Sequence, residues 1–134
     1  MIALDAPRIL AVDDDREFRR SLVKIFQKAG FLVNVAADGH QAMTLLDKNH
    51  YDLVVLDLKM PGKSGLEVLR EIKAQTPEAK VIMVTAFADP DSIRQALSAG
   101  AFAYLNKPVK REDILASVKK ALELSVPRSE DEVV

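Results

Sequence analysis

Residues Tyr51–Leu69 read YDLVVLDLKMPGKSGLEVL, and this stretch decides the fold. The four apolar residues Leu53–Leu56 stand between polar neighbours, and a run this short and rich in β-branched residues is typical of a strand buried on both faces. The segment 61–65, PGKSG, breaks the pattern before apolar residues return at helical spacing. Asp57 is therefore predicted at the carboxyl end of a buried strand, where open α/β sheets bind ligands. The alternative is an Asp that only caps the following turn.

The composition is that of one ordinary globular domain. The chain has 134 residues, of which 49% are hydrophobic and 29% charged, and its net charge is -1. This balance gives no reason to expect direct nucleic-acid binding. No apolar run approaches the roughly 20 residues of a membrane span, and no signal peptide is evident, so we expect no membrane insertion and a cytoplasmic location. The absence of cysteine excludes disulfides and thiolate metal sites.

The rest of the chain repeats the alternation of short apolar runs and helical periodicity. Runs of strand length occur at residues 9–12, 32–35, 53–56, 81–84 and 102–105. Asp38 and the pair Asp89–Pro90 are typical helix starts, and Gly30 is a typical helix stop. The last helix is predicted from about Arg111 to Leu124.

Five strands alternating with five helices predict an α/β fold, a flavodoxin-like (βα)5 doubly wound sandwich. The second strand is the least apolar, so we expect a five-stranded parallel sheet in the order 2-1-3-4-5 with helices on both faces. In that order the carboxyl ends of four strands meet at one crevice. They bring together the polar residues Asp13, Asp14, Asp57, Thr85 and Lys107.

These residue types indicate phosphoryl chemistry. Three carboxylates in one crevice repel each other at neutral pH, and Mg²⁺ with its preference for oxygen ligands would relieve that repulsion. The Lys107 ammonium and the Thr85 hydroxyl complete a receptor for a phosphoryl group, and a carboxylate inside it can act as the nucleophile. Asp15 is predicted to be a helix cap only. The Lys107–Pro108 bond is a candidate for the cis form.

The chain resembles the receiver (phosphoacceptor) domain of two-component response regulators over roughly residues 8–124. The resemblance is carried by Val12–Asp14, Leu56–Gly62 with Gly65, Val84–Ala86 and Tyr104–Pro108. It implies that Asp57 accepts a phosphoryl group from the phosphohistidine of a sensor histidine kinase or a histidine phosphotransfer protein. It also implies a signalling domain rather than an enzyme, one that assists only its own phosphorylation and dephosphorylation.

The resemblance assigns a role to each site residue. Mg²⁺ would be held by Asp13, Asp14, Asp57 and the backbone carbonyl of Lys59. Lys107 would contact the phosphoryl oxygens, and Thr85 would move to hydrogen-bond one of them. Tyr104 would turn inward in response and remodel the surface of the fourth helix, fifth strand and fifth helix. Tyr104 can also be read as a plain strand aromatic.

Two further positions are expected to influence loss of the phosphoryl group. Phe87 is bulky and apolar and could hinder the attacking water, whereas Lys59 could pair with an acid or with the phosphoryl group. We therefore expect a phosphorylated form that is moderately long-lived.

The expected domain organisation is an extension at residues 1–7, the receiver at 8–124, and an acidic tail or start of a linker at 125–134. The output is then a downstream protein partner or an output domain outside this sequence, and dimerisation on phosphorylation is a further option. Five basic residues lie on or near the expected output face: Arg94, Lys110, Arg111, Lys119 and Lys120. Most of them are read as solvated helix surface.

Three alternatives fit the sequence less well. A haloacid-dehalogenase-like phosphatase needs an acid two residues after its nucleophile, where this chain has Lys59. A flavin or nucleotide binder wants a Gly- or Ser/Thr-rich loop after the first strand, where Asp13–Asp15 would repel phosphate in the absence of a metal. A pseudo-receiver that binds partners without phosphorylation would lack the acids or the lysine, and this chain keeps them.

Overall fold

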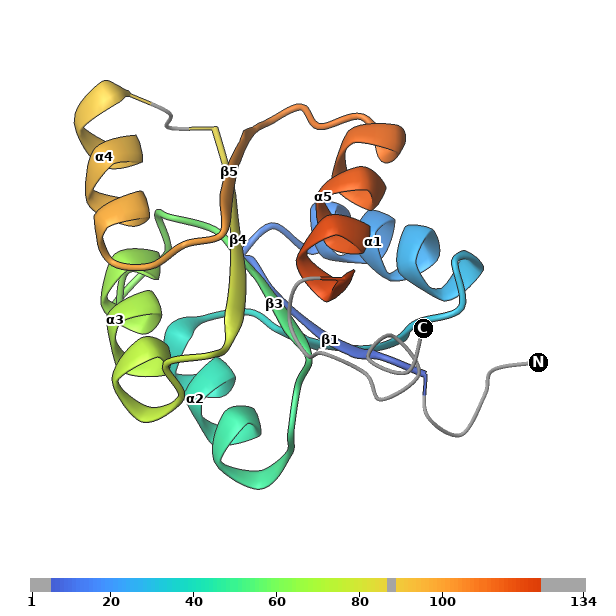
Figure 1. The fold of residues 1–134 in the computed structure, drawn as a ribbon, viewed down its shortest axis with the longest axis horizontal. Coiled ribbons are helices and arrows are strands. Elements are labelled where there is room, and N and C mark those ends of the chain that lie inside the picture. Colours follow the sequence, from blue (N-terminus) through green and yellow to red (C-terminus); the bar gives the residue numbers. More distant parts are fainter. Residues whose placement is uncertain (1–5, 87–88, 124–134) are drawn as a thin grey trace, which may run out of the picture.

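The computed structural model describes residues 6–86 and 89–123, which form one parallel sheet covered by helices on both faces (Figure 1). The strands are β1 (Arg8–Val12), β2 (Leu32–Ala36), β3 (Leu53–Leu56), β4 (Lys80–Thr85) and β5 (Ala103–Asn106). The helices are α1 (Arg16–Lys28), α2 (Gly39–Lys48), α3 (Gly65–Gln75), α4 (Pro90–Ser98) and α5 (Arg111–Glu123). All pairings are parallel and the order is β2-β1-β3-β4-β5, so the predicted flavodoxin-like topology is confirmed.

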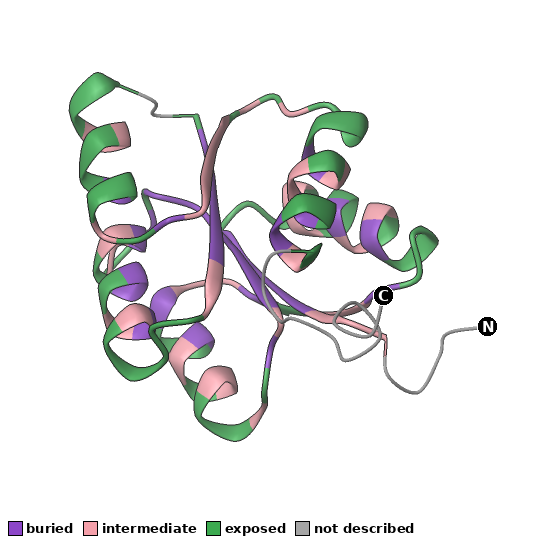
Figure 2. Ribbon diagram, in the orientation of Figure 1, coloured by how far each residue is buried: buried purple, intermediate pink, exposed green. Residues whose placement is uncertain are grey.

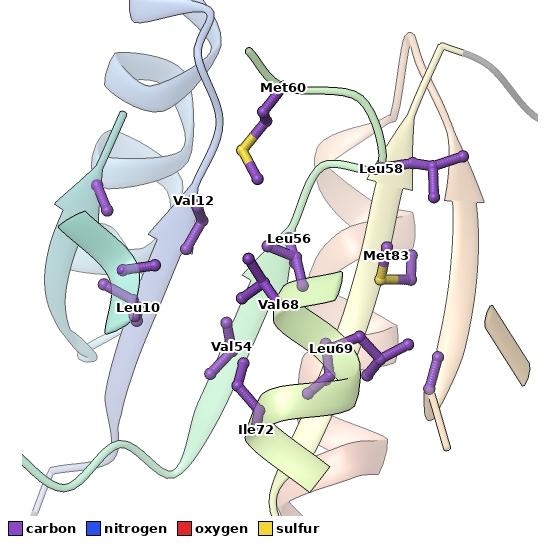
Figure 3. Close-up of a cluster of buried hydrophobic side chains, with 14 of the residues drawn as sticks. Leu10, Val12, Val54, Leu56, Leu58, Met60, Val68, Leu69, Ile72 and Met83 are labelled. Carbon is purple, nitrogen blue, oxygen red and sulfur yellow. The ribbon is translucent and has the colours of Figure 1, made fainter. Parts of the chain in front are cut away.

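The sheet separates two hydrophobic cores. Helices α1 and α5 lie on one face, and α2, α3 and α4 lie on the other (Figure 1). Buried residues are concentrated on the strands and on the inward faces of the helices (Figure 2). Figure 3 shows the core beneath α3, where Val68, Leu69 and Ile72 face the side chains of the sheet. Strand β3 is buried along its whole length, because it contributes alternate residues to both cores.

The helix starts follow the predicted capping chemistry. The carboxylate of Asp15 accepts hydrogen bonds from the backbone of the first turn of α1, Asp38 does the same for α2, and Asp89 caps α4 ahead of Pro90. Helix α3 begins with a capping box between Ser64 and Glu67. These caps define the first residue of each helix, and so they also define where the preceding loop at the carboxyl edge of the sheet ends.

Two details differ from the sequence-based expectation. Strand β5 covers Ala103–Asn106, one residue later than predicted, because its pairing with β4 begins at Ile82 opposite Ala103. In α4 only Ala96 is buried, and the side chain of Leu97 is 47% exposed although it follows the apolar spacing. The predicted end of the last helix at Leu124 lies outside the described residues. Within the described ranges, no helix combines the length and apolar character that a membrane span requires.

Candidate functional site

The predicted site residues meet at the carboxyl edge of the sheet. Asp13 and Asp57 immediately follow β1 and β3, Thr85 is the last residue of β4, and Lys107 immediately follows β5. Backbone pairing continues into these positions, because the N–H of Asp57 donates to the carbonyl of Val12 (3.0 Å) and that of Lys107 to the carbonyl of Thr85 (2.9 Å). The regular sheet therefore positions the side chains directly.

Three carboxylates form the floor of the site. One oxygen from each of Asp13, Asp14 and Asp57 lies within 4.8 Å of the others. The side chains of Asp13 and Asp57 are buried, with residue exposures of 1% and 5%, whereas Asp14 is exposed. Two acids are thus fixed in the protein, and the third lies on the solvent side of the site.

Lys107 neutralises part of this charge. Its Nζ lies 2.7 Å from Oδ2 of Asp13 and 3.7 Å from Oδ2 of Asp57. The ammonium also lies 4.3 Å from the centroid of the Phe18 ring, a cation–π distance. The Lys107–Pro108 peptide bond is cis, as hypothesised from the sequence. The two distances from Nζ place the lysine over both buried acids, on the opposite side of the crevice.

The protonation of Asp57 reflects its surroundings. Burial raises the pKa of this carboxyl and the negative charge of Asp13 raises it further, while Lys107, the Thr85 hydroxyl and the backbone N–H of Lys59 act in the opposite direction. Among the described residues, Oδ1 of Asp57 is a buried oxygen without a hydrogen-bond partner. A buried, unsatisfied carboxylate oxygen beside two further carboxylates fits a hard divalent cation such as Mg²⁺.

The two predicted switch residues lie on the neighbouring strands β4 and β5, where Tyr104 is paired with Met83, two residues before Thr85. Thr85 is fully buried, and its position opposite Asn106 places it one strand away from Tyr104. The Tyr104 ring is half-buried and packs against the core on the α4 side. Burial raises the pKa of the Tyr104 hydroxyl, and the negative charges of Asp89 and Asp57 raise it further. Tyr104 therefore lies within electrostatic reach of the central carboxylate.

Gly65 lets the loop after β3 close tightly. Its N–H donates to the carbonyl of Leu58 (2.8 Å). A Cβ at this position would lie 1.9 Å from the backbone oxygen of Asp57 and 2.8 Å from Cα of Leu58. Only glycine permits this contact, which holds the start of α3 directly against the backbone of Asp57.

Two residues of the site did not emerge from the sequence. Phe18 supports Lys107 as described above, and Nη1 of Arg19 donates to the backbone carbonyl of Asp13 (2.7 Å). Both lie in the first turn of the helix that Asp15 caps, and this position beside the acidic run is the signal that could have identified them. The Lys59 side chain is exposed. The predicted modulator Phe87 lies outside the described residues.

The chain is similar in sequence to a known protein family and to curated bacterial proteins. Residues 9–119 match the family model of the response regulator receiver domain. The sporulation initiation phosphotransferase F of Bacillus subtilis (strain 168) is 38% identical over 117 residues, covering 87% of this chain and 94% of that protein. The regulatory protein AtoC of Escherichia coli (strain K12) is 35% identical, but the 92% of this chain that aligns spans only 27% of AtoC.

The fold is also similar to that of a solved receiver domain structure. The receiver domain protein (CheY-like) from Methanospirillum hungatei JF-1 superposes with a TM-score of 0.86 at 34% sequence identity, covering 89% of this chain and 95% of that one.

Proposed function

Because this chain belongs to the response regulator receiver domain family, we propose that Asp57 accepts a phosphoryl group from the phosphohistidine of a sensor histidine kinase or a histidine phosphotransfer protein. The chain is a receiver domain of a two-component system and carries a signalling fold, not that of a classic enzyme family. Its own catalytic contribution is limited to its phosphorylation and dephosphorylation.

One observation carries the proposal. Asp57 offers a buried oxygen, Oδ1, with no hydrogen-bond partner among the described residues, while Lys107 lies 3.7 Å from its other oxygen. The backbone N–H of Lys59 and the Thr85 hydroxyl also act on this carboxylate, so a turn cap accounts for part of its surroundings but not for the buried, unsatisfied Oδ1. The unsatisfied Oδ1 lies beside two more carboxylates, and Lys107 stands near the other oxygen, Oδ2; this arrangement suits attack on a phosphoryl group.

The transfer proceeds by in-line displacement. An Asp57 carboxylate oxygen attacks phosphorus, the O–P bond of an acyl phosphate forms, and the P–N bond breaks with its electron pair returning to the donor imidazole. The Lys107 ammonium is positioned to neutralise the charge that the phosphoryl oxygens bring into the crevice. Thr85 contributes a buried hydroxyl as hydrogen-bond donor at the same edge.

Mg²⁺ would be held by Asp13, Asp14, Asp57 and the backbone carbonyl of Lys59. When bound, it would supply positive charge to the carboxylates and to the transferred phosphoryl oxygens. In the structure Asp13 Oδ1 accepts a hydrogen bond from the Asp15 N–H, and Asp13 Oδ2 accepts one from Lys107 Nζ. The exposed Asp14 leaves the metal position open to solvent.

The donor is proposed to approach beside Lys107. A mainly apolar groove of about 450 Å³ lies between α1 and the loop after β5. It is lined by Phe18, Ser21, Leu22, Ile25, Ala86, Lys107, Pro108 and Val109. Since Lys107 borders both this groove and the acidic crevice, a helix of the donor seated here would present its phosphohistidine to Asp57.

The response is proposed to pass through Thr85 and Tyr104. Movement of Thr85 toward the phosphoryl group would open space for the half-buried Tyr104 ring to turn inward, which would alter the α4-β5-α5 surface. That surface carries the exposed Leu97 and the basic residues Arg94 and Lys119. Its reader would be a downstream protein partner, an output domain outside this sequence, or a second phosphorylated copy.

The remaining parts of the proposal concern organisation. We propose that residues 8–124 form the receiver, that 1–7 are an extension, and that 125–134 are an acidic tail or the start of a linker. A cytoplasmic location follows from the expected kinase partner. The phosphorylated form is proposed to be moderately long-lived, and a half-life of only seconds in purified protein with Mg²⁺ would contradict this.

The decisive experiment is phosphorylation by acetyl phosphate, followed by intact mass, with Mg²⁺ and with Mg²⁺ removed by chelation. A single Mg²⁺-dependent phosphoryl adduct is expected in the wild type and in Asp47→Asn, a control outside the site. The adduct should be absent in Asp57→Asn. An adduct that persists in Asp57→Asn would exclude Asp57 as the acceptor.

A further inference from the structure

The edge strand β2 combines an unblocked backbone edge with a basic helix beside it. Within residues 6–86 and 89–123, strand β2 pairs with β1 alone. Its sequence, LVNVA, contains no charged residue and no proline, the usual means by which natural proteins block an edge strand. The edge is therefore chemically competent to pair with another strand.

The pairing pattern shows which backbone groups face outward. The N–H of Leu32 and the carbonyl of Ala36 are bonded toward β1. Since direction alternates along a strand, the backbone groups of Val33 and Val35 point to the free edge. Asn34 Nδ2 donates to the Val33 carbonyl (3.3 Å), and the described chain places no further strand beside Val35. The Val35 side chain is 41% exposed.

A shallow groove of about 460 Å³ runs between this edge and α1. It is lined by Arg16, Arg19, Arg20, Val23, Lys24, Gln27 and Val35. The Arg19 guanidinium is engaged by the Asp13 carbonyl, and Arg20 has only an exposed contact with Glu17 at 3.8 Å. Arg16 and Lys24 form no ion pair with any described acid. The groove is thus strongly positive on a chain whose net charge is -1.

We infer that this groove binds an extended acidic segment of a partner protein, which adds a strand to β2 and places alternate acidic side chains against Arg16, Arg20 and Lys24. In an added strand, every second side chain faces the same side, so one row of acids can meet the helix while the backbone pairs with Val33 and Val35. A second copy of this chain fits poorly, because two-fold edge pairing would bring two basic helices together. Single-stranded nucleic acid fits poorly because the groove has no aromatic side chain for base stacking.

This surface lies at the opposite edge of the sheet from β4 and β5. The receiver would thus have a second recognition surface, separate from the α4-β5-α5 surface.

The test is a titration of the isotope-labelled protein followed by NMR, with an eight-residue peptide of alternating Glu and Thr as the probe. Amide shifts confined to β2 and α1 are expected, and the matching Lys/Thr peptide should give none. Arg20→Glu with Lys24→Glu should weaken binding about tenfold. Lys119→Glu with Lys120→Glu, the same charge change on exposed α5 positions, should leave it unchanged.

A second variant separates strand addition from simple charge attraction. Val35→Pro removes an outward N–H at an edge position where proline is tolerated, so the fold and phosphorylation by acetyl phosphate should persist while the peptide no longer binds. Binding that survives Val35→Pro, shifts outside β2 and α1, or no binding at all would overturn the inference. So would stronger binding of single-stranded DNA or phosphatidylserine vesicles at the same residues.

Discussion

Replacing Gly65 with alanine tests how the loop after β3 supports the acceptor. The new Cβ would lie 1.9 Å from the backbone oxygen of Asp57, whereas ordinary contacts begin at 3.4 Å. Backbone meets backbone here, so no side-chain rotation can relieve the clash, and the oxygen must withdraw by about 1.5 Å. We expect the free energy of unfolding to fall by about 3 kcal/mol, the upper end for overpacking.

The larger effect should be on function. A displacement of about 1 Å in a reacting group can slow a reaction on the order of 100-fold, so phosphorylation by acetyl phosphate should slow by about that factor. The assay is a time course of intact mass with Mg²⁺, beside urea unfolding followed by circular dichroism. Gly62→Ala is the matched control, because Gly62 has a φ of +76° and a Cβ added there would meet no atom within 4 Å. It should lose about 1 kcal/mol from the left-handed backbone and keep the wild-type rate.

A folded Gly65→Ala protein that is phosphorylated within about twofold of the wild-type rate would refute the reasoning. So would an equal loss of rate in Gly62→Ala, because the effect would then belong to loop stiffness and not to the contact with Asp57.

Three further predictions test the core, a helix cap and the ion pair. Phe26→Ala should lower the free energy of unfolding by about 4 kcal/mol because this ring is fully buried, and Leu97→Ala by less than about 0.5 kcal/mol, both measured by urea denaturation. The Ser64 capping box lowers the pKa of Glu67, so the stability it contributes is present above the unfolded pKa of about 4.3 and is lost as pH falls through the lower folded pKa. Urea denaturation of Glu67→Gln and wild type across this range should therefore show a difference that shrinks on acidification. Lys107→Ala should destabilise by about 3 kcal/mol at neutral pH without metal, because buried Asp13 loses its ion-pair partner, and added Mg²⁺ should restore part of the loss in a thermal melt.

The sequence predicts the topology because each strand is a short apolar run followed by a helix with its own cap. The strand order also follows from the sequence, since the run that forms β2 is interrupted by the polar Asn34, and the structure places β2 at an edge. The polar residues that end the buried strands do converge, which confirms the placement of the acids and of Lys107.

What the sequence did not provide is the depth and direction of individual side chains. Asp13 and Asp14 are adjacent and chemically identical, yet one is buried and paired with Lys107 while the other is exposed. That difference arises from where β1 ends relative to its neighbours. Leu97 follows the apolar spacing of α4 but lies outside the core, because α4 buries a narrow stripe around Ala96. Similarly, Gly65 reads as a helix breaker in sequence, and only three dimensions reveal the backbone that it touches.

The site has consequences for how the protein is made. Lys107 and Asp13 are separated by 94 positions, and the intervening strands supply Asp57 and Thr85. Because synthesis runs from the N-terminus, Asp13, Asp14 and Asp57 are made well before Lys107, whose ammonium balances part of their charge. The ability to receive a signal should therefore appear late and all at once, after β5 has joined the sheet. A truncated product that ends before β5 would keep Asp13, Asp14 and Asp57 but lack Lys107, so the proposed phosphoryl transfer to Asp57 should fail in it.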